Sequence, residues 1–243
     1  MKLLFSVLLG VGCLSAAAQT GCPSPFDKDD SFLRRFHFTV GGGVTDLKGT
    51  LRENEKLGHG IVGKADYQII RGLYAGVEGQ FGALRAESTD GTKFVKNNYI
   101  AAGLNFAIHP LEMLVGDYFS NRILQEGVNS IYVGAGVKAV RNKYDMDESQ
   151  NLEVTNYRDA NGTWMFPTIN AGVAVPINKL DYKKNKFFSI VANAQFNQGS
   201  NENLDGFHAK QEFQQTDGSV GYRLFKGQKD NYNFYYLGLR YSF

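Results

Sequence analysis

The segment YNFYYLGLRYSF, residues 232–243, alternates between two kinds of side chain along its whole length. Successive side chains of a β-strand point to opposite faces, so this alternation predicts a two-faced strand. One face is apolar and aromatic except at one end, and its members are Asn233, Tyr235, Leu237, Leu239, Tyr241 and Phe243. The other face combines aromatic rings with a glycine, a hydroxyl and a cation, and its members are Tyr232, Phe234, Tyr236, Gly238, Arg240 and Ser242.

The same alternation recurs in earlier segments of roughly ten residues each, which is the pattern of membrane-spanning β-barrels. The predicted strands are 36–47, 59–70, 73–84, 98–109, 130–141, 163–177, 187–197 and 232–243. The first contains consecutive glycines at 41–43, which would weaken a strand of a soluble sheet but permit close packing or sharp coiling in a small barrel. A soluble β-sandwich is the competing fold, because its strands also alternate.

Charged and amide side chains fall on the inner face in the middle of these strands. They are Lys64, Asp66, Glu78, Gln80, Lys138 and Arg240. A dry soluble core cannot hold such groups without partners, whereas the interior of a membrane barrel is polar. An eight-stranded barrel is wide enough only for its own side chains or for one small ligand. We therefore predict an ion-pair and hydrogen-bond network that fills a narrow lumen; a gated pore or ligand pathway is the alternative.

The region 198–231 leaves two strand counts open. Weak strand patterns at 207–215 and 219–225 flank an Asp-Gly pair, which is a hairpin signal. If both segments crossed the membrane, the barrel would have about ten strands, with Gln211 and Gln215 exposed to lipid at a cost. We therefore expect about eight spanning strands, with the hairpin inside a long final loop.

The connections between the predicted strands differ in length and character. Long polar connections follow the first, third, fifth and seventh strands, and outer-membrane barrels place such loops on the outside. The connection 110–129 is an exception on the periplasmic side, because its apolar residues recur at helical spacing and predict a short amphipathic helix. The apolar positions are Leu111, Leu114, Val115, Tyr118 and Phe119.

The first residues have the features of a removable secretory signal. Lys2 precedes an apolar stretch at 3–11, and alanines at 16–18 form a cleavage site. The expected organisation is a signal peptide at 1–18, a flexible arm at 19–35 and a barrel at 36–243. Only Cys22 would remain after cleavage, so an internal disulfide is not expected. Pairing between chains, lipid modification and an inert role stay open for this thiol.

Charge and motifs argue against several classes of function. The formal net charge of +2 gives no nucleic-acid-binding surface, so no nucleic-acid partner is expected. The chain has no H-E-x-x-H, G-x-S-x-G or P-loop motif, and its histidines lie in no recognisable catalytic pattern. These histidines are His37, His59, His109 and His208. The acidic run at 145–148 lacks the ligand spacing of an EF-hand. No catalytic residue, cofactor or metal site is expected.

The signal, the rhythm of the strands and the YSF ending together resemble small bacterial outer-membrane β-barrels of the porin-like or OmpA/OmpX-like kind. The resemblance extends over about 36–243. It implies residence in the outer membrane of a Gram-negative bacterium, with membrane lipid and the barrel-assembly machinery as partners. It also implies that Tyr241 and Phe243 belong to the C-terminal signal which that machinery reads during insertion.

This resemblance implies two functions. The first is a non-enzymatic barrel with a polar, plugged lumen and long surface loops, in a structural, adhesive or surface-recognition role. The alternative is a narrow porin-like channel or transporter for small solutes or lipid. The sequence does not identify the extracellular ligand.

Overall fold

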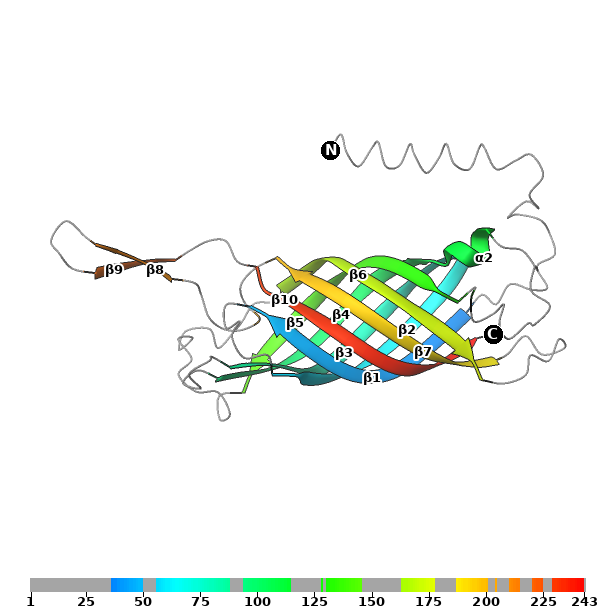
Figure 1. Ribbon diagram of the computed structural model, residues 1–243, viewed down its shortest axis with the longest axis horizontal. Coiled ribbons are helices and arrows are strands. Elements are labelled where there is room, and N and C mark those ends of the chain that lie inside the picture. The colour runs from blue at the N-terminus through cyan, green and yellow to red at the C-terminus, as the bar shows by residue number, and fades with distance from the viewer. Residues whose placement is uncertain are drawn as a thin grey trace, which may run out of the picture. The chain divides into compact units, whose positions relative to one another are not determined.

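Eight antiparallel strands close into a barrel in the computed structural model (Figure 1). The structure describes residues 36–49, 56–87, 94–114, 128, 130–145, 163–177, 187–200, 204, 210–214, 220–224 and 229–242. The barrel strands are β1 (Phe36–Lys48), β2 (Gly58–Ile70), β3 (Leu73–Glu87), β4 (Phe94–Ile108), β5 (Tyr132–Tyr144), β6 (Thr163–Pro176), β7 (Phe187–Gly199) and β10 (Asn231–Ser242). The predicted eight-stranded barrel is confirmed, and the β-sandwich alternative is wrong.

The other two strands form a sheet of their own. β8 (Lys210–Gln214) and β9 (Val220–Leu224) pair only with each other, from Lys210 opposite Leu224 to Gln214 opposite Val220. They therefore form the predicted hairpin inside the last connection, and the ten-stranded alternative is wrong.

The barrel closes between its first and last strands. β1 pairs with β10 from His37 opposite Ser242 to Lys48 opposite Asn231, so β1 begins where β10 ends. The short turn between β2 and β3 lies at this end, and the connections after β1, β3, β5 and β7 lie at the other. Short turns face the periplasm in outer-membrane barrels, so we name these the periplasmic end and the outer end.

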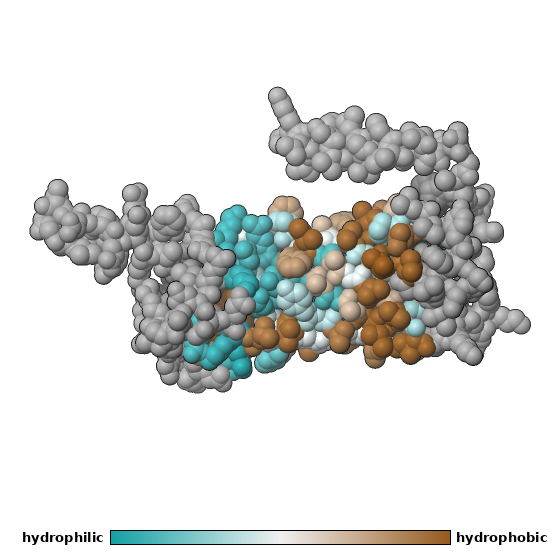
Figure 2. Space-filling view, in the orientation of Figure 1, coloured by the Kyte–Doolittle hydropathy of each residue, from teal (hydrophilic) through white to brown (hydrophobic). Residues whose placement is uncertain are grey.

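The outer face of the barrel is apolar and exposed. Val40, Phe166 and Leu237 are each at least 65% exposed, and similar aliphatic and aromatic side chains lie on every barrel strand. Aromatic pairs border this band, with Phe188 and Tyr241 5.0 Å apart near the periplasmic end and Phe196 6.4 Å from Tyr235 near the outer end. Figure 2 shows brown residues along the visible face, paler residues in its middle and teal residues at its left end. Such exposure is favourable only where lipid replaces water.

No helix in the described part of the chain is long and apolar enough to cross a membrane.

The predicted faces of the strands are confirmed except at the start of β6. The alternation along 163–177 places Met165 on the outward face with Ile169 and Val173, yet Met165 is completely buried, while Trp164 and Phe166 are exposed. Met165 pairs with Gly199 and Thr168 with Asn197, so β6 has one more residue than β7 between these pairs. An extra residue reverses the faces of all residues on one side of it, and the regular alternation could not show where it lies.

Three strands extend outward three or four residues farther than the sequence predicted. Of the loop expected at 85–96, residues 85–87 lie in β3 and 94–96 lie in β4, where Arg85 pairs with Lys96 and Glu87 with Phe94. β5 likewise continues to Tyr144. Backbone pairing needs no apolar side chains once the strands have left the lipid, so the polar composition of these segments was misleading.

The predicted periplasmic helix is present as α2 (Pro110–Leu114), and 115–127 lie outside the described residues. The N–H of His109 donates to the carbonyl of Gly72 over 2.7 Å, which fixes the start of α2 against the turn between β2 and β3. Gly72 has a φ of 75°, and a Cβ there would lie 2.3 Å from Cγ of Met113. Only glycine suits this turn.

Several predictions concern residues outside the described part of the chain. These are the signal peptide at 1–18, the arm at 19–35 with Cys22, the acidic residues Asp147 and Glu148, His208 and Phe243.

Candidate functional site in the barrel lumen

Inner-face glycines make room for long side chains from neighbouring strands. A Cβ on Gly103 of β4 would lie 2.6 Å from Cγ of Lys138, and one on Gly172 of β6 would lie 2.6 Å from the Tyr132 hydroxyl. Lys138 and Tyr132 on β5 therefore lie across the backbone of the adjacent strand. This pairing explains why a small barrel combines many glycines with large polar side chains.

A polar network crosses the middle of the lumen. Glu78 of β3 forms an ion pair with Lys138, and Lys138 Nζ donates to Gln195 Oε1 of β7 over 2.7 Å. Gln80 Nε2 donates to Glu78 Oε1 over 2.7 Å, and Gln80 Oε1 accepts a hydrogen bond of 2.9 Å from the Tyr232 hydroxyl of β10. β3 and β7 lie on opposite walls of the barrel. The network therefore joins the two walls and fills the section between them.

A second charged group lies beside this network. Lys64 Nζ is 3.3 Å from Asp66 Oδ2, and both side chains are buried. Arg240 Nε donates to Thr39 Oγ1 over 3.3 Å. Both cations lie near the Tyr132 ring, with Lys64 Nζ 5.5 Å and Arg240 Cζ 5.4 Å from its centroid. The ring face offers each cation a favourable contact in an interior with few carboxylates.

The structure therefore places all six sequence-selected lumen residues inside the barrel, in two groups. One contains Glu78, Gln80 and Lys138, and the other contains Lys64, Asp66 and Arg240. Arg240 makes no ion pair within the described part of the chain and contacts a hydroxyl and a ring instead. Tyr241, selected as part of the insertion signal, lies on the lipid-facing side against Phe188.

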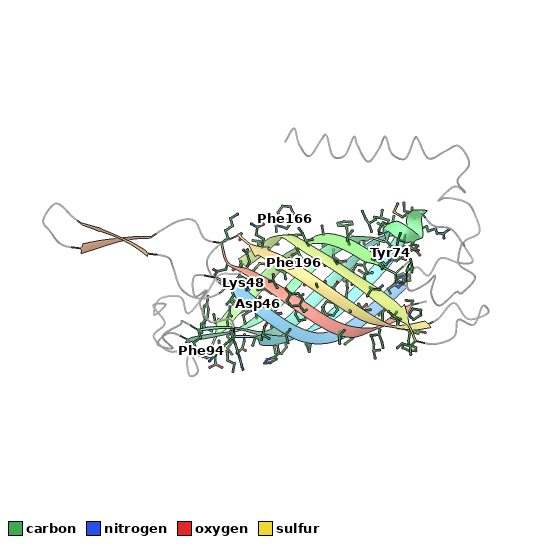
Figure 3. The ribbon with its side chains drawn as sticks, in the orientation of Figure 1. Asp46, Lys48, Tyr74, Phe94, Phe166 and Phe196 are labelled. Atoms are coloured by element: carbon green, nitrogen blue, oxygen red, sulfur yellow. The ribbon has the colours of Figure 1, made fainter. Side chains whose placement is uncertain are left out.

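The periplasmic mouth is occupied by a carboxylate from α2. Glu112 accepts hydrogen bonds from Gln68 Nε2 over 2.8 Å and from the Tyr74 hydroxyl over 3.0 Å. His109 Nδ1 lies 3.8 Å from the same carboxylate. The His109 ring also packs 4.5 Å from the Tyr74 ring and 5.3 Å from the Tyr132 ring. Figure 3 shows Tyr74 beside α2 at this end of the barrel.

The outer mouth is occupied by apolar side chains. Leu204, from the connection after β7, is fully buried in one cluster with Leu47, Leu84, Val95 and Met165. Its N–H donates to Asp230 Oδ2 and its carbonyl accepts from Asn97 Nδ2, each over 2.8 Å. These bonds satisfy both backbone polar groups of Leu204, as burial of a residue requires.

Some polar groups between the two mouths make no hydrogen bond in the described part of the chain. They include both amide atoms of Asn105 and of Asn170, and the hydroxyl of Thr168. Asn105 pairs with Gly136, and Gly136 pairs with Thr168, so two of these side chains lie in one row of the sheet. The row has hydrogen-bonding capacity for water or a small polar molecule.

Two of the four histidines, His37 and His109, are buried at the periplasmic end of the lumen. Ser242 Oγ lies 2.8 Å from His37 Nδ1, and both side chains are buried in the lumen. The His37 ring also packs 5.0 Å from the Tyr74 ring. Within the described residues, no three histidine, cysteine or acidic side chains gather in a group that could hold a metal ion.

One hollow lies on the lipid-facing surface of the barrel, outside the lumen. Its volume is about 570 Å³, and Gly42, Ala171, Ala192, Ala194 and Leu237 are among the residues that line it. Residues of four neighbouring strands line this depression, and the small side chains among them come from β1, β6 and β7.

Sequence reasoning missed the residues that close the two mouths. Glu112 is the acid of the short helix, next to His109, and Leu204 is the apolar residue of the polar run 198–206. Both could have been noticed as exceptions in their surroundings. Gln195 and Tyr232 were assigned to the inner face by their alternation but were not selected for the network.

No family model and no curated protein sequence matches this chain. Among solved structures, Neisserial surface protein A has 13% identity and a TM-score of 0.43, covering 86% of this chain and 97% of that one. The attachment invasion locus protein Ail of Yersinia pestis, in complex with the heparin analogue sucrose octasulfate, has 14% identity and a TM-score of 0.39, covering 86% and 98%. OprG from Pseudomonas aeruginosa has 10% identity and a TM-score of 0.40, covering 88% and 98%. Similarities at this level assign no activity.

The geometry of the barrel itself determines its class. Its outer face carries an apolar band between aromatic residues, and its interior is polar and filled by side chains. An eight-stranded barrel of this construction spans the bacterial outer membrane. The protein is a small, eight-stranded membrane β-barrel of the outer-membrane type.

Proposed function

We propose that the protein is a non-enzymatic, plugged surface barrel with a structural, adhesive or surface-recognition role. The observation that carries this proposal is the network from Glu78 through Lys138 to Gln195, which links opposite walls of the lumen. A barrel that fills its own interior with bonded side chains is rigid, and rigid scaffolds commonly position recognition loops. The connections at the outer end are the parts of the chain that this scaffold would present.

The two mouths support the same proposal. Glu112 is held in the periplasmic mouth by Gln68 and Tyr74, and Leu204 is buried in the outer mouth. An ion entering the barrel would meet a bonded carboxylate, a network of charged groups and an apolar layer. Each layer must rearrange before water and ions can pass, and an ion in an apolar layer is strongly disfavoured.

Planar-bilayer recording of the refolded protein tests this proposal. Heat-modifiable migration in gel electrophoresis would first establish that the barrel is folded. We expect no discrete conductance steps from the folded wild-type protein. Reproducible unitary steps from the wild type would overturn the plugged scaffold.

A narrow channel or transporter for small solutes or lipid is the second candidate. The observation that favours it is the unused hydrogen-bonding capacity of Asn105, Asn170 and Thr168 between the two closures. Glu112→Ala and Leu204→Ala would open one mouth each, and the double variant would open both. The measurement is the rate of solute entry into proteoliposomes. A rate that rises only in the double variant would favour a gated pathway. An unchanged rate would support the plugged scaffold.

The partners proposed here are the membrane lipid, the assembly machinery during insertion and an extracellular ligand held by the loops. Replacing 145–162 with a short Gly-Ser linker tests the last of these, with 178–186 on the periplasmic side as the matched control replacement. Adhesion of expressing cells to host-cell matrix should fall only after the first replacement. Equal adhesion by both variants would argue for a purely structural role.

A further inference from the structure

Cations at the outer end of the barrel are concentrated on three neighbouring strands. Arg85 of β3 pairs directly with Lys96 of β4, and Arg141 and Lys143 follow on β5. Arg141 and Lys143 are exposed on the outward side, and their backbone partners on β4 are Ile100 and Asn98. We name Arg85, Lys96, Arg141 and Lys143 the β3–β5 basic patch.

Most of the charge of this patch is not neutralised by protein groups. Lys96 lies 3.2 Å from Asp145, but Arg85, Arg141 and Lys143 make no ion pair in the described ranges. The Nε of Arg85 is buried and makes no hydrogen bond there. By contrast, Lys48 of β1 lies 3.2 Å from Asp46, and Lys56 is paired with Glu87. Like charges on adjacent strands repel, so an anion beside this patch would be stabilising.

The patch lies immediately beyond the apolar band. Arg141 comes two residues after Ala139, which is exposed on the lipid-facing side of β5. Ile100, the partner of Arg141 on β4, is 58% exposed on the same side. Basic side chains at this depth reach the level of lipid headgroups, where they attract negative charge.

A groove of small residues leads up to the patch. Gly63, Gly79, Ala102 and Ala139 are paired in succession across β2, β3, β4 and β5, and all four are exposed. No atom lies within 4 Å of the position that a Cβ would take on Gly63 or Gly79. At the usual spacing between strands this row is about 15 Å long.

Larger side chains form the walls of this groove. Phe81 and Ile100 border it toward the outer end, and Val77 and Leu104 border it toward the periplasmic end. All four are more than half exposed. The row ends at Ala139, two residues before Arg141, so the groove and the basic patch form one continuous surface.

We propose that this face of β2–β5 binds one phosphate-bearing lipid of the outer leaflet. The phosphates would lie against Arg85, Arg141 and Lys143, and an acyl chain would lie along Gly63, Gly79, Ala102 and Ala139. Charge complementarity selects an anionic headgroup, and the adjoining apolar groove selects a lipid over a soluble anion. The inference requires only that the barrel spans the outer membrane and does not depend on the proposed function.

Native mass spectrometry of the full-length protein in detergent tests the headgroup contact. The probe is bisphosphorylated lipid A, and its matched control is the same lipid after enzymatic removal of both phosphates. Arg141→Gln with Lys143→Gln should weaken binding of the phosphorylated probe roughly 20- to 30-fold, at about 1 kcal/mol for each basic residue. Lys229→Gln, which removes an exposed cation beside β10, should change binding less than twofold.

Gly79→Leu tests the groove, with Ala135→Leu as its control on an exposed lipid-facing position of β5 outside the row. The first should weaken binding severalfold and the second should leave it unchanged, while both fold as judged by heat-modifiable migration. Equal binding of the phosphorylated and dephosphorylated probes, or equal binding by wild type and the Arg141/Lys143 double variant, would overturn the site. Equal effects of Gly79→Leu and Ala135→Leu would overturn the groove.

Discussion

At the scale of the residue, the stability of the barrel interior depends on opposite charges that are buried side by side. Glu78 and Lys138 are each less than 5% exposed and lie against one another. Their desolvation is offset by the ion pair and by hydrogen bonds from Gln80 and Gln195. Removing one partner leaves the other charged, buried and poorly bonded, which costs more than the pair itself contributes.

Glu78→Ala should therefore lower the free energy of unfolding by about 3–5 kcal/mol. The measurement is urea-induced unfolding of the protein in lipid vesicles, followed by tryptophan fluorescence. Glu78→Ala combined with Lys138→Met is the matched control, and it should recover much of the loss because no lone charge remains. An unchanged stability of Glu78→Ala alone would contradict the network.

At the scale of the element, the alternation of side chains predicted the strands and most of their faces. It could not predict local irregularities in the strands. The extra residue at the start of β6 reverses the faces of Trp164 and Met165, and nothing in a regular period-two pattern marks its position. The outward extensions of β3, β4 and β5 were missed for another reason. Polar side chains in water are compatible with either a strand or a loop, so composition could not distinguish them.

The turn between β2 and β3 gives a test at this scale. Gly72→Ala should destabilise the barrel by about 1–3 kcal/mol, because an L-residue is strained at a positive φ and its Cβ would collide with Met113. Gly63→Ala is the control, since the space around its Cβ position is open, and it should stay within about 0.5 kcal/mol of the wild type. Similar losses in both variants, measured by the same unfolding assay, would contradict this account of the turn.

At the scale of the whole molecule, the barrel and its polar interior could be predicted, but the two closures could not. The alternation of side chains placed Glu78, Lys138 and Arg240 on the inner face, where the structure has them, because alternation is a local property of each strand. Leu204 and Glu112 reach the mouths only because the strands bring distant connections to the ends of the barrel. The sequence around each residue could have singled it out as an exception, but it does not indicate which distant residues it contacts.

Leu204→Ala tests the outer closure. Truncating a fully buried leucine should cost about 2–5 kcal/mol of unfolding free energy. Leu57, which is 58% exposed at the same end of the barrel, is the matched control, and its replacement by alanine should change stability by less than about 0.5 kcal/mol. A negligible loss for Leu204→Ala would mean that this residue does not pack in the mouth.

The lipid-facing band can be tested with a single charge. Leu237 is 65% exposed in the middle of β10, and Leu237→Arg should cost about 2–4 kcal/mol, as expected for a cation near the centre of a bilayer. Asn233→Arg, farther toward the outer end of the same strand and on the same face, should cost about 0–1 kcal/mol. Equal costs in vesicle unfolding experiments would place the membrane boundary elsewhere.

The pairing of β1 with β10 determines when the barrel can close during folding. The first strand can complete its pairing only with the last twelve residues of the sheet, from Asn231 to Ser242. Until these residues are in place, both sheet edges stay open, and open edges invite pairing between chains. Barrel closure is therefore a late, long-range step, and pairing between unfinished chains competes with it.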